Sequence, residues 1–380
     1  MHNHLMRRIS ISISISILAS ILMTLSVVSA QARTVPSTFV KYASSPMLCN
    51  PGILVLDPSS NHIIYSRHPD VMRAPASVLK LFSMATTLNT FSPDLVFTTT
   101  ISTTANPDTF VVNGQGDPWM TSSEFEATKY HRAFLPHLID EVLAANPSLK
   151  TINLEYSGVY TLDMKTVKRF FAGRVTINLV PIASPHIALA DAVNPIATVS
   201  SPKLAEIVQF TLLYSDNILA DRLVRAAAKQ LGFGSDAVGI KSAIDKTLND
   251  LKINSTGLSV QDGNGLSHAT RVSVRQVVDL LIAIKSDPKF QVIYDGLPTA
   301  GETGTLKTRF VKDAPNAVGL VHAKTGWIDT TVSLAGYVRV RAREYVFAVV
   351  ANHIRNHETA REDARVTIDK MLGTIARPLN

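Results

Sequence analysis

The pattern of apolar and polar positions predicts a sheet built from both ends of the chain. Two short apolar runs, 53–56 and 63–65, flank a turn-forming segment that starts with Asp57-Pro58, which is typical of a β-hairpin. Near the other end, apolar runs separated by short polar joints predict antiparallel strands. These runs cover 318–321, 332–340 and 345–350.

Apolar residues at helical spacing predict helices between these two groups of strands. The expected helices cover 74–88, 203–231, 273–284 and 358–375. Pro75 lies where the first of them begins, a position at which proline is tolerated because the first backbone N–H groups of a helix have no partner within it.

The middle of the chain has a different pattern. Thr, Ile and Val dominate 96–112, which predicts strands, and a further strand is expected over 151–154 and a helix over 134–145. Strands at both ends with helices between them predict an α/β (α+β) domain interrupted by an insertion. We assign 33–100 and 193–380 to this discontinuous domain and 101–192 to a smaller, β-rich inserted domain.

The N-terminus has the features of a secretory signal peptide. Arg7 and Arg8 precede an uncharged apolar run over 9–29, and Ala30-Gln31-Ala32 supplies a cleavage site of small residues. We predict that residues 1–32 are a signal peptide and that the protein is exported to the periplasm or cell-wall space. The alternative is an uncleaved signal anchor. No other segment is apolar enough to cross a membrane, so membrane association is expected to be peripheral at most.

Composition narrows the class of protein further. The chain has 380 residues, of which 46% are hydrophobic and 18% charged, and this excludes collagen, low-complexity and disulfide-scaffold chains. The net charge of +7 comes from scattered residues, so no nucleic-acid-binding stripe is expected. Cys49 is the only cysteine, which excludes an internal disulfide, and we expect it to be a small buried apolar residue.

Ser77-Val78-Leu79-Lys80 contains the first candidate for chemistry. Positions three apart on a helix share a face, so the Ser77 hydroxyl and the Lys80 amine can meet. A serine needs an adjacent base to become a nucleophile, and a neutral lysine can provide one. The spacing alone is weak evidence, because Ser200 and Lys203 have it too. Ser77 differs because it lies at the start of an apolar helix.

Two further motifs follow in the sequence. Ser215-Asp216-Asn217 falls inside the second predicted helix, either on a solvated face or on the wall of a site. Lys324-Thr325-Gly326 follows a strand-like run, and a glycine at a strand edge lets a substrate backbone approach and pair with the strand. Lys324 could then bind a carboxylate or tune its neighbours.

The three motifs in this order resemble those of penicillin-binding proteins and serine β-lactamases. Other segments resemble one family more closely, the D-alanyl-D-alanine carboxypeptidase/endopeptidase family, the class C low-molecular-mass penicillin-binding proteins. These segments are 115–118, 261–267, 301–306 and 333–337. The resemblance implies a β-lactamase/transpeptidase-like fold, with an antiparallel sheet flanked by helices.

The resemblance also implies a mechanism and roles for residues. Ser77 would attack a D-Ala-D-Ala bond of a peptidoglycan stem peptide, with Lys80 as base and Ser215 as proton relay. The backbone N–H groups of Ser77 and Trp327 would form the oxyanion hole. The substrate-binding residues would be Asn217, Lys324, Thr325 and Gly326. No cofactor, metal or nucleic acid is implied, and β-lactams would be covalent inhibitors.

Two features depart from the family pattern. The insertion is short for a family that often has two nested domains, so we infer that one is kept. Trp327 replaces the usual Thr or Ser, whose hydroxyl would help to bind the terminal carboxylate of the substrate. Because Trp327 keeps its backbone N–H, acylation can survive while carboxylate recognition weakens.

Two alternative functions remain open. One is a β-lactamase, although no obvious deacylating carboxylate is present. The other is a non-catalytic peptidoglycan-binding protein on the same scaffold, which Trp327 suggests. Among other motifs, the 262–265 segment is interpreted as a tight turn, with a role in shaping the site as the alternative. His353 and His357 have metal-like spacing, but without an apparent third ligand we interpret them as loop residues.

Overall fold

The computed structural model describes residues 35–379. The predicted signal peptide, residues 1–32, lies outside this range. Within it, no helix combines the length and the apolar character that a membrane crossing requires.

The first sheet joins the two ends of the described chain, as the hydrophobic pattern predicts. It has five strands in the order β2-β1-β10-β9-β8, and every neighbouring pair is antiparallel. Its strands are β1 (Gly52–Asp57), β2 (His62–Arg67), β8 (Val321–Ile328), β9 (Thr331–Val340) and β10 (Arg343–Ala351). β8 begins three residues later than the predicted apolar run and extends to Ile328, so that Lys324-Thr325-Gly326 lies within the strand.

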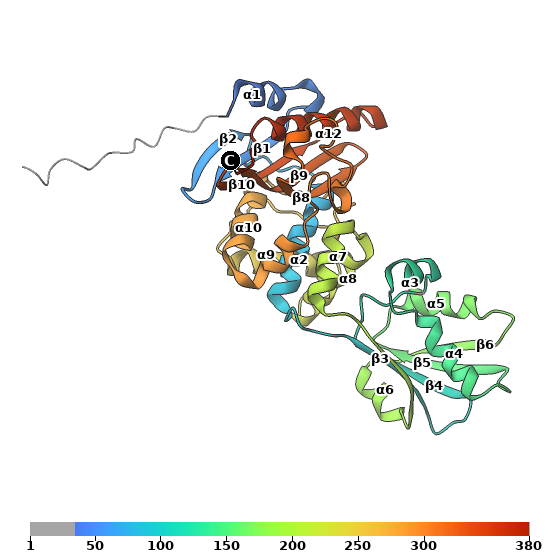
Figure 1. The fold of residues 1–380 in the computed structure, drawn as a ribbon. Coiled ribbons are helices and arrows are strands. Elements are labelled where there is room, and N and C mark those ends of the chain that lie inside the picture. The colour runs from blue at the N-terminus through green and yellow to red at the C-terminus, as the bar shows by residue number, and fades with distance from the viewer. Residues whose placement is uncertain (1–34, 380) are drawn as a thin grey trace, which may run out of the picture. The chain divides into compact units, whose positions relative to one another are not determined.

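Helices cover both faces of this sheet because successive side chains in a strand point to opposite faces. Ile53 and Val55 pack with α1 (Ser37–Ala43) and α12 (Glu358–Gly373) in one core. Leu54 and Leu56 pack with the other helices in a second core. Figure 1 shows the same arrangement, with α1 and α12 on one side of the strands and α2 and α10 on the other.

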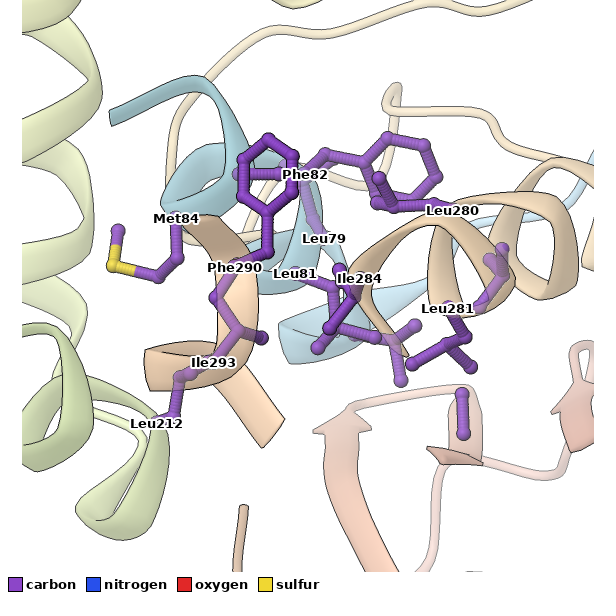
Figure 2. Packing of buried hydrophobic residues seen from close by; sticks show 14 of the residues in the cluster. Leu79, Leu81, Phe82, Met84, Leu212, Leu280, Leu281, Ile284, Phe290 and Ile293 are labelled. Atoms are coloured by element: carbon purple, nitrogen blue, oxygen red, sulfur yellow. The ribbon is translucent and has the colours of Figure 1, made fainter. Parts of the chain in front are cut away.

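The helix that follows the Ser77 segment lies at the centre of the second core. α2 (Lys80–Thr90) is buried from its first residue to Leu88. Figure 2 shows its Leu81 and Phe82 among side chains of α10 (Val274–Ser286) and of the segment that leads into α11 (Gln291–Asp295). Each such apolar side chain contributes about 1.5–3 kcal/mol when buried, so the start of α2 is held rigidly.

The second long predicted helix is in fact two helices, which corrects the sequence analysis. α7 (Leu204–Tyr214) ends at Ser215, whose φ of 58° is left-handed, and α8 (Asn217–Gln230) begins immediately afterwards. Asp216 starts α8, because its side chain accepts a hydrogen bond from the Leu219 N–H at 2.8 Å. α9 (Ala237–Asp250), which the sequence analysis did not identify, follows.

The second sheet forms the middle of the chain. Its order is β6-β5-β4-β3-β7, and β4, β5 and β6 are parallel to one another, whereas β3 is antiparallel to both of its neighbours. The strands are β3 (Thr98–Thr103), β4 (Thr109–Gly114), β5 (Thr151–Ser157), β6 (Thr176–Pro181) and β7 (Pro195–Ser200). Because bounds of 101–192 would cut β3 and omit β7, we propose 98–200 for the inserted unit.

Helices contribute as much to this unit as strands do. They are α3 (Glu124–Tyr130), α4 (Leu135–Ala145), α5 (Thr161–Phe170) and α6 (Pro185–Asp191). The description of the unit as β-rich therefore understates its helical content. The helices arise because parallel strands need long crossover connections, which helices usually form.

Cys49, in the first domain, also differs from expectation, since it is only half-buried and packs against the rim of the α1/α12 core.

A buried ion pair ties α12 to the rest of the first domain and gives a test of the fold. Asp369 is fully buried and lies 2.5 Å from the Arg309 guanidinium. We expect Asp369→Ala to lower the free energy of unfolding by about 3–5 kcal/mol, because the Arg309 charge stays buried without this partner. Urea denaturation measures the change. Lys246→Ala, which removes an exposed pair with Asp250, is the control, and an equal loss in both variants would contradict the burial argument.

Candidate active site

Ser77 lies in a tight turn of 3-10 helix over Ala76–Leu79, directly before α2. Its side chain is close to fully buried, with 8% exposed. Ala76 has a φ of 50°, a left-handed conformation that residues other than glycine rarely adopt. Such strain costs about 1–3 kcal/mol and persists only where the surroundings hold it.

The first sheet holds this strained turn in position. The Ser333 hydroxyl on β9 donates a hydrogen bond to the Pro75 carbonyl at 2.7 Å. The Asn352 side chain, after β10, accepts from the Ala74 N–H and donates to the Ala74 carbonyl, both at 2.9 Å. The backbone before Ser77 is therefore fixed by side chains from the end of the chain.

The amine of Lys80 has three oxygen neighbours. Its Nζ lies 2.8 Å from each of Ser77 Oγ, Asn217 Oδ1 and the Asn264 carbonyl oxygen. A neutral amine has two N–H donors and one lone pair. The amide oxygen and the carbonyl can only accept, so they take both donors. The lone pair is then left for the Ser77 hydroxyl, which is the arrangement that a base requires.

Burial favours this neutral form. Desolvation lowers the pKa of the Lys80 amine to about 7, while the charges of Asp216 and Asp262 act in the opposite direction and raise it. The lysine can thus be deprotonated near neutral pH without losing its hydrogen bonds.

The segment after Val260 packs against the Ser77 turn. Asp262 accepts hydrogen bonds from the Gly265 N–H at 2.7 Å and the Ser267 N–H at 2.8 Å, which closes a turn. Gly265 has a φ of 81°, and a Cβ there would lie 2.0 Å from the Ala76 carbonyl oxygen. Only glycine fits, and this close approach presents the Asn264 carbonyl to Lys80. The tight turn therefore also shapes the site.

Ser215 faces the site from the junction of α7 and α8. Its Oγ lies 2.8 Å from the Nζ of Lys324, which is fully buried in β8. Burial, and secondarily the charge of Lys80, lower the pKa of the Lys324 amine well below its usual value. The amine of Lys324 is therefore not exposed to a substrate, and it contacts the site through its hydrogen bond with the Ser215 hydroxyl.

β8 is an edge strand, and the backbone N–H groups of alternate residues point to its outer side. The Ala323 N–H points away from β9, because it donates to the Pro298 carbonyl at 3.0 Å. Alternation along the strand turns the N–H groups of Thr325 and Trp327 the same way. At Gly326 a Cβ would lie 2.8 Å from the Pro75 carbonyl oxygen, so glycine allows β8 to lie directly beside the Ser77 turn.

Thr325 and Trp327 complete this edge. The Thr325 hydroxyl donates to the Thr305 hydroxyl at 2.9 Å, which connects β8 to the 301–306 segment. The Trp327 side chain is 40% exposed. Part of this large aromatic ring at the rim is therefore open to contact with a ligand.

The inserted unit reaches the Ser215 turn. The Arg132 side chain is almost completely buried and lies 3.9 Å from the Asp216 carboxylate. The Tyr130 ring packs against those of Phe210 and Tyr214, the latter being the residue before Ser215. These contacts fix the conformation of the turn that carries Ser215 and Asn217.

The structure thus brings together all the residues that the sequence analysis proposed. Sequence reasoning missed several supporting groups, namely the Asn264 carbonyl, Asp216, Thr305, Ser333 and Asn352. The glycines of the Asp-Gly-Asn-Gly string at 262–265 were the available signal for the Asn264 carbonyl.

Among residues 35–379, no group of three His, Cys, Asp or Glu side chains could hold a metal. His357 instead caps α12, accepting from the Thr359 N–H at 3.3 Å.

Comparison with known protein families gives one match over most of the chain. The model of the "D-Ala-D-Ala carboxypeptidase 3 (S13) family" matches residues 40–145 and 182–375. A relative from Mycolicibacterium smegmatis, carboxypeptidase DacB, is 26% identical over 347 residues, covering 79% of this chain and 75% of the relative.

Solved structures share the fold. Penicillin binding protein 4 of Haemophilus influenzae superimposes with a TM-score of 0.68 at 16% identity, over 85% of this chain and 95% of that one. A predatory peptidoglycan endopeptidase of Bdellovibrio bacteriovorus gives a TM-score of 0.59 at 12% identity, over 85% and 92%. These similarities confirm the predicted β-lactamase/transpeptidase-like fold.

The Lys80 environment predicts a pH dependence for the reactivity of Ser77. Since only the neutral amine accepts a proton, acylation of Ser77 should fall about tenfold per pH unit below pH 7 and level off above it. Asp216→Asn removes a charge that raises the pKa of Lys80, so the midpoint should move to lower pH. The rate of labelling by a serine-acylating probe, measured from pH 5 to 9, tests both statements.

A matched control comes from the surface. Asp94, whose side chain is 73% exposed and pairs with Lys203, carries the same charge far from these contacts. Asp94→Asn should leave the midpoint unchanged. An unshifted midpoint in Asp216→Asn would argue against Lys80 as the titrating group.

Proposed function

The chain belongs to the D-Ala-D-Ala carboxypeptidase 3 (S13) family and is a serine-type peptidase of the penicillin-binding class, and we propose that it cleaves D-Ala-D-Ala and related bonds of peptidoglycan stem peptides. One observation carries this proposal. The buried Lys80 amine contacts Ser77 Oγ while two acceptor oxygens engage its remaining hydrogens. This geometry supports acyl transfer through Ser77 without any cofactor.

In the proposed acylation step, Ser77 Oγ attacks the carbonyl carbon on the acyl side of the scissile bond. The hydroxyl proton passes to the Lys80 lone pair as the new C–O bond forms. The backbone N–H groups of Ser77 and Trp327 would bind the developing oxyanion, each contributing about 3–4 kcal/mol to transition-state stabilisation. The outward direction of the Trp327 N–H supports this role.

The leaving amine needs a proton when the C–N bond breaks. Ser215 would pass on to it the proton that Lys80 took from Ser77, while the Lys324 amine, 2.8 Å away, holds the Ser215 hydroxyl in place. Asn217 Oδ1 is occupied by Lys80, so the amide NH₂ would donate to a substrate carbonyl. Thr325, Gly326 and Lys324 would form the binding edge, along which an extended peptide adds to β8. Water then releases the acyl group from Ser77 and restores the enzyme.

The partners and location follow from the same proposal. A penicillin binding protein 4 of the same fold has been solved in complex with a β-lactam. We propose that β-lactams acylate Ser77 here as well. The features of residues 1–32 support export to the periplasm or cell-wall space, where peptidoglycan is found, with at most peripheral membrane contact.

Covalent labelling tests the nucleophile. Ser77→Ala should abolish labelling by a fluorescent penicillin, because no other hydroxyl lies at 2.8 Å from the Lys80 amine among the described residues. Labelling is read on a denaturing gel, and Ser83→Ala, which changes a buried serine of α2 three residues after Lys80, should still be labelled. Persistent labelling of Ser77→Ala would reject the assignment.

Two outcomes would favour the alternative functions. Rapid turnover of nitrocefin by the wild-type protein would favour a β-lactamase. Binding of cell-wall fragments without any acyl-enzyme would favour a non-catalytic binding protein. Incubation with muropeptides, read by mass before and after penicillin treatment, separates removal of terminal D-Ala from cleavage of cross-links.

Trp327 stands where the family usually has Thr or Ser, and restoring a hydroxyl there is predicted to change the substrate preference. Trp327→Thr introduces a hydroxyl at the substrate-binding edge, so we expect carboxypeptidase turnover to improve more than acylation by penicillin. Release of D-Ala and second-order labelling rates measure the two activities. Equal changes in both would contradict the interpretation of Trp327.

A further inference from the structure

The side chains of Thr325 and Trp327 mark one face of the substrate-binding edge. Alternate residues of a strand share a face, so these two side chains lie opposite to Lys324 and Gly326. Their cross-strand partners on β9, Leu334 and Val332, belong to the core that α12 covers. A substrate carboxylate held beside Thr325 would therefore lie on the α12 side of the sheet.

Arg361, near the start of α12, is the cation at this position. Its guanidinium carbon lies 5.4 Å from the centroid of the Trp327 ring, at stacking distance. One nitrogen, Nη1, donates to the Asp329 carbonyl at 2.9 Å and to Asn356 Oδ1 at 2.8 Å. Arg361 is thus held against the end of β8 by two neutral oxygens.

The charge of Arg361 is not used within the described part of the chain. Its hydrogen bonds there go to neutral acceptors only, and its Nε is buried without a partner. Arg365, one turn further along α12, is instead paired with Glu362 and Asp369. A cation near a helix N-terminus is also unfavourable for the helix, so stability of α12 does not explain the charge.

We propose that Arg361 is a specificity-determining residue, whose guanidinium binds the free carboxylate at the end of the substrate. It compensates in part for the hydroxyl that Trp327 lacks, and its guanidinium lies against the indole ring. Both hydrogens of Nη1 are engaged and Nε is buried, so the hydrogens of Nη2 are left to bind the carboxylate through a charge-assisted hydrogen bond. The inference rests on the proposed peptidase activity.

The test compares two substrates that differ only in their terminal group. Diacetyl-Lys-D-Ala-D-Ala has a free carboxylate, and its C-terminal amide does not. We expect Arg361→Gln to lower kcat/KM for the acid at least tenfold, mainly by raising KM. For the amide, kcat/KM should change less than twofold. Arg361→Lys keeps the charge without the guanidinium and should recover part of the loss.

Arg355→Gln is the matched control, because Arg355 is exposed and also lies close to the start of α12. It should leave both substrates unaffected. Equal losses on acid and amide in Arg361→Gln would assign a purely structural role to Arg361, and no loss on the acid would also overturn the proposal. Failure of the peptidase proposal is distinct, since the wild-type protein would then cleave neither substrate and form no penicilloyl-enzyme at Ser77.

Discussion

The site depends on one buried amine, that of Lys80. It is fully buried, and its contacts are matched to the neutral form: two acceptors and one hydroxyl, all at 2.8 Å. Each acceptor comes from a different part of the chain, Asn217 from the start of α8 and Asn264 from the turn beside the strained Ala76. The second core, the α7–α8 junction and the turn around Gly265 therefore converge on satisfying a single nitrogen.

Much of this arrangement could be predicted from the sequence. The strands at both chain ends follow from continuous apolar runs, and the order of Ser77, Ser215 and Lys324 indicates the family. The break at Ser215 could not be predicted, because Leu212 and Leu219 continue the helical spacing across it. Its left-handed backbone is set by contacts from Lys324 and the inserted unit, which no local pattern reveals. Contacts of main-chain groups, such as that of the Asn264 carbonyl with Lys80, could not be predicted either, because sequence motifs identify side chains and not backbone positions.

The inserted unit contributes to the active site, although its sheet is separate. Arg132 lies beside Asp216, and Tyr130 contacts Tyr214, so both flanks of Ser215 have partners from the insertion. Arg222 of α8 bonds to Asp163 of α5, a second charged contact between the units. Loss of the insertion would thus remove supports of the turn that carries Ser215.

The pairing of the two chain ends in the first sheet has a consequence for folding. Gly52 of β1 lies opposite Val350 of β10, so nearly the whole sequence separates partners in one ladder. Closing so large a loop is entropically costly and makes contact order high, which slows the search for the native topology. During vectorial synthesis β1 cannot pair with β10 until the residues up to Ala351 have emerged. Until then, β1 can pair only with β2, and its other edge has to be kept from aggregation.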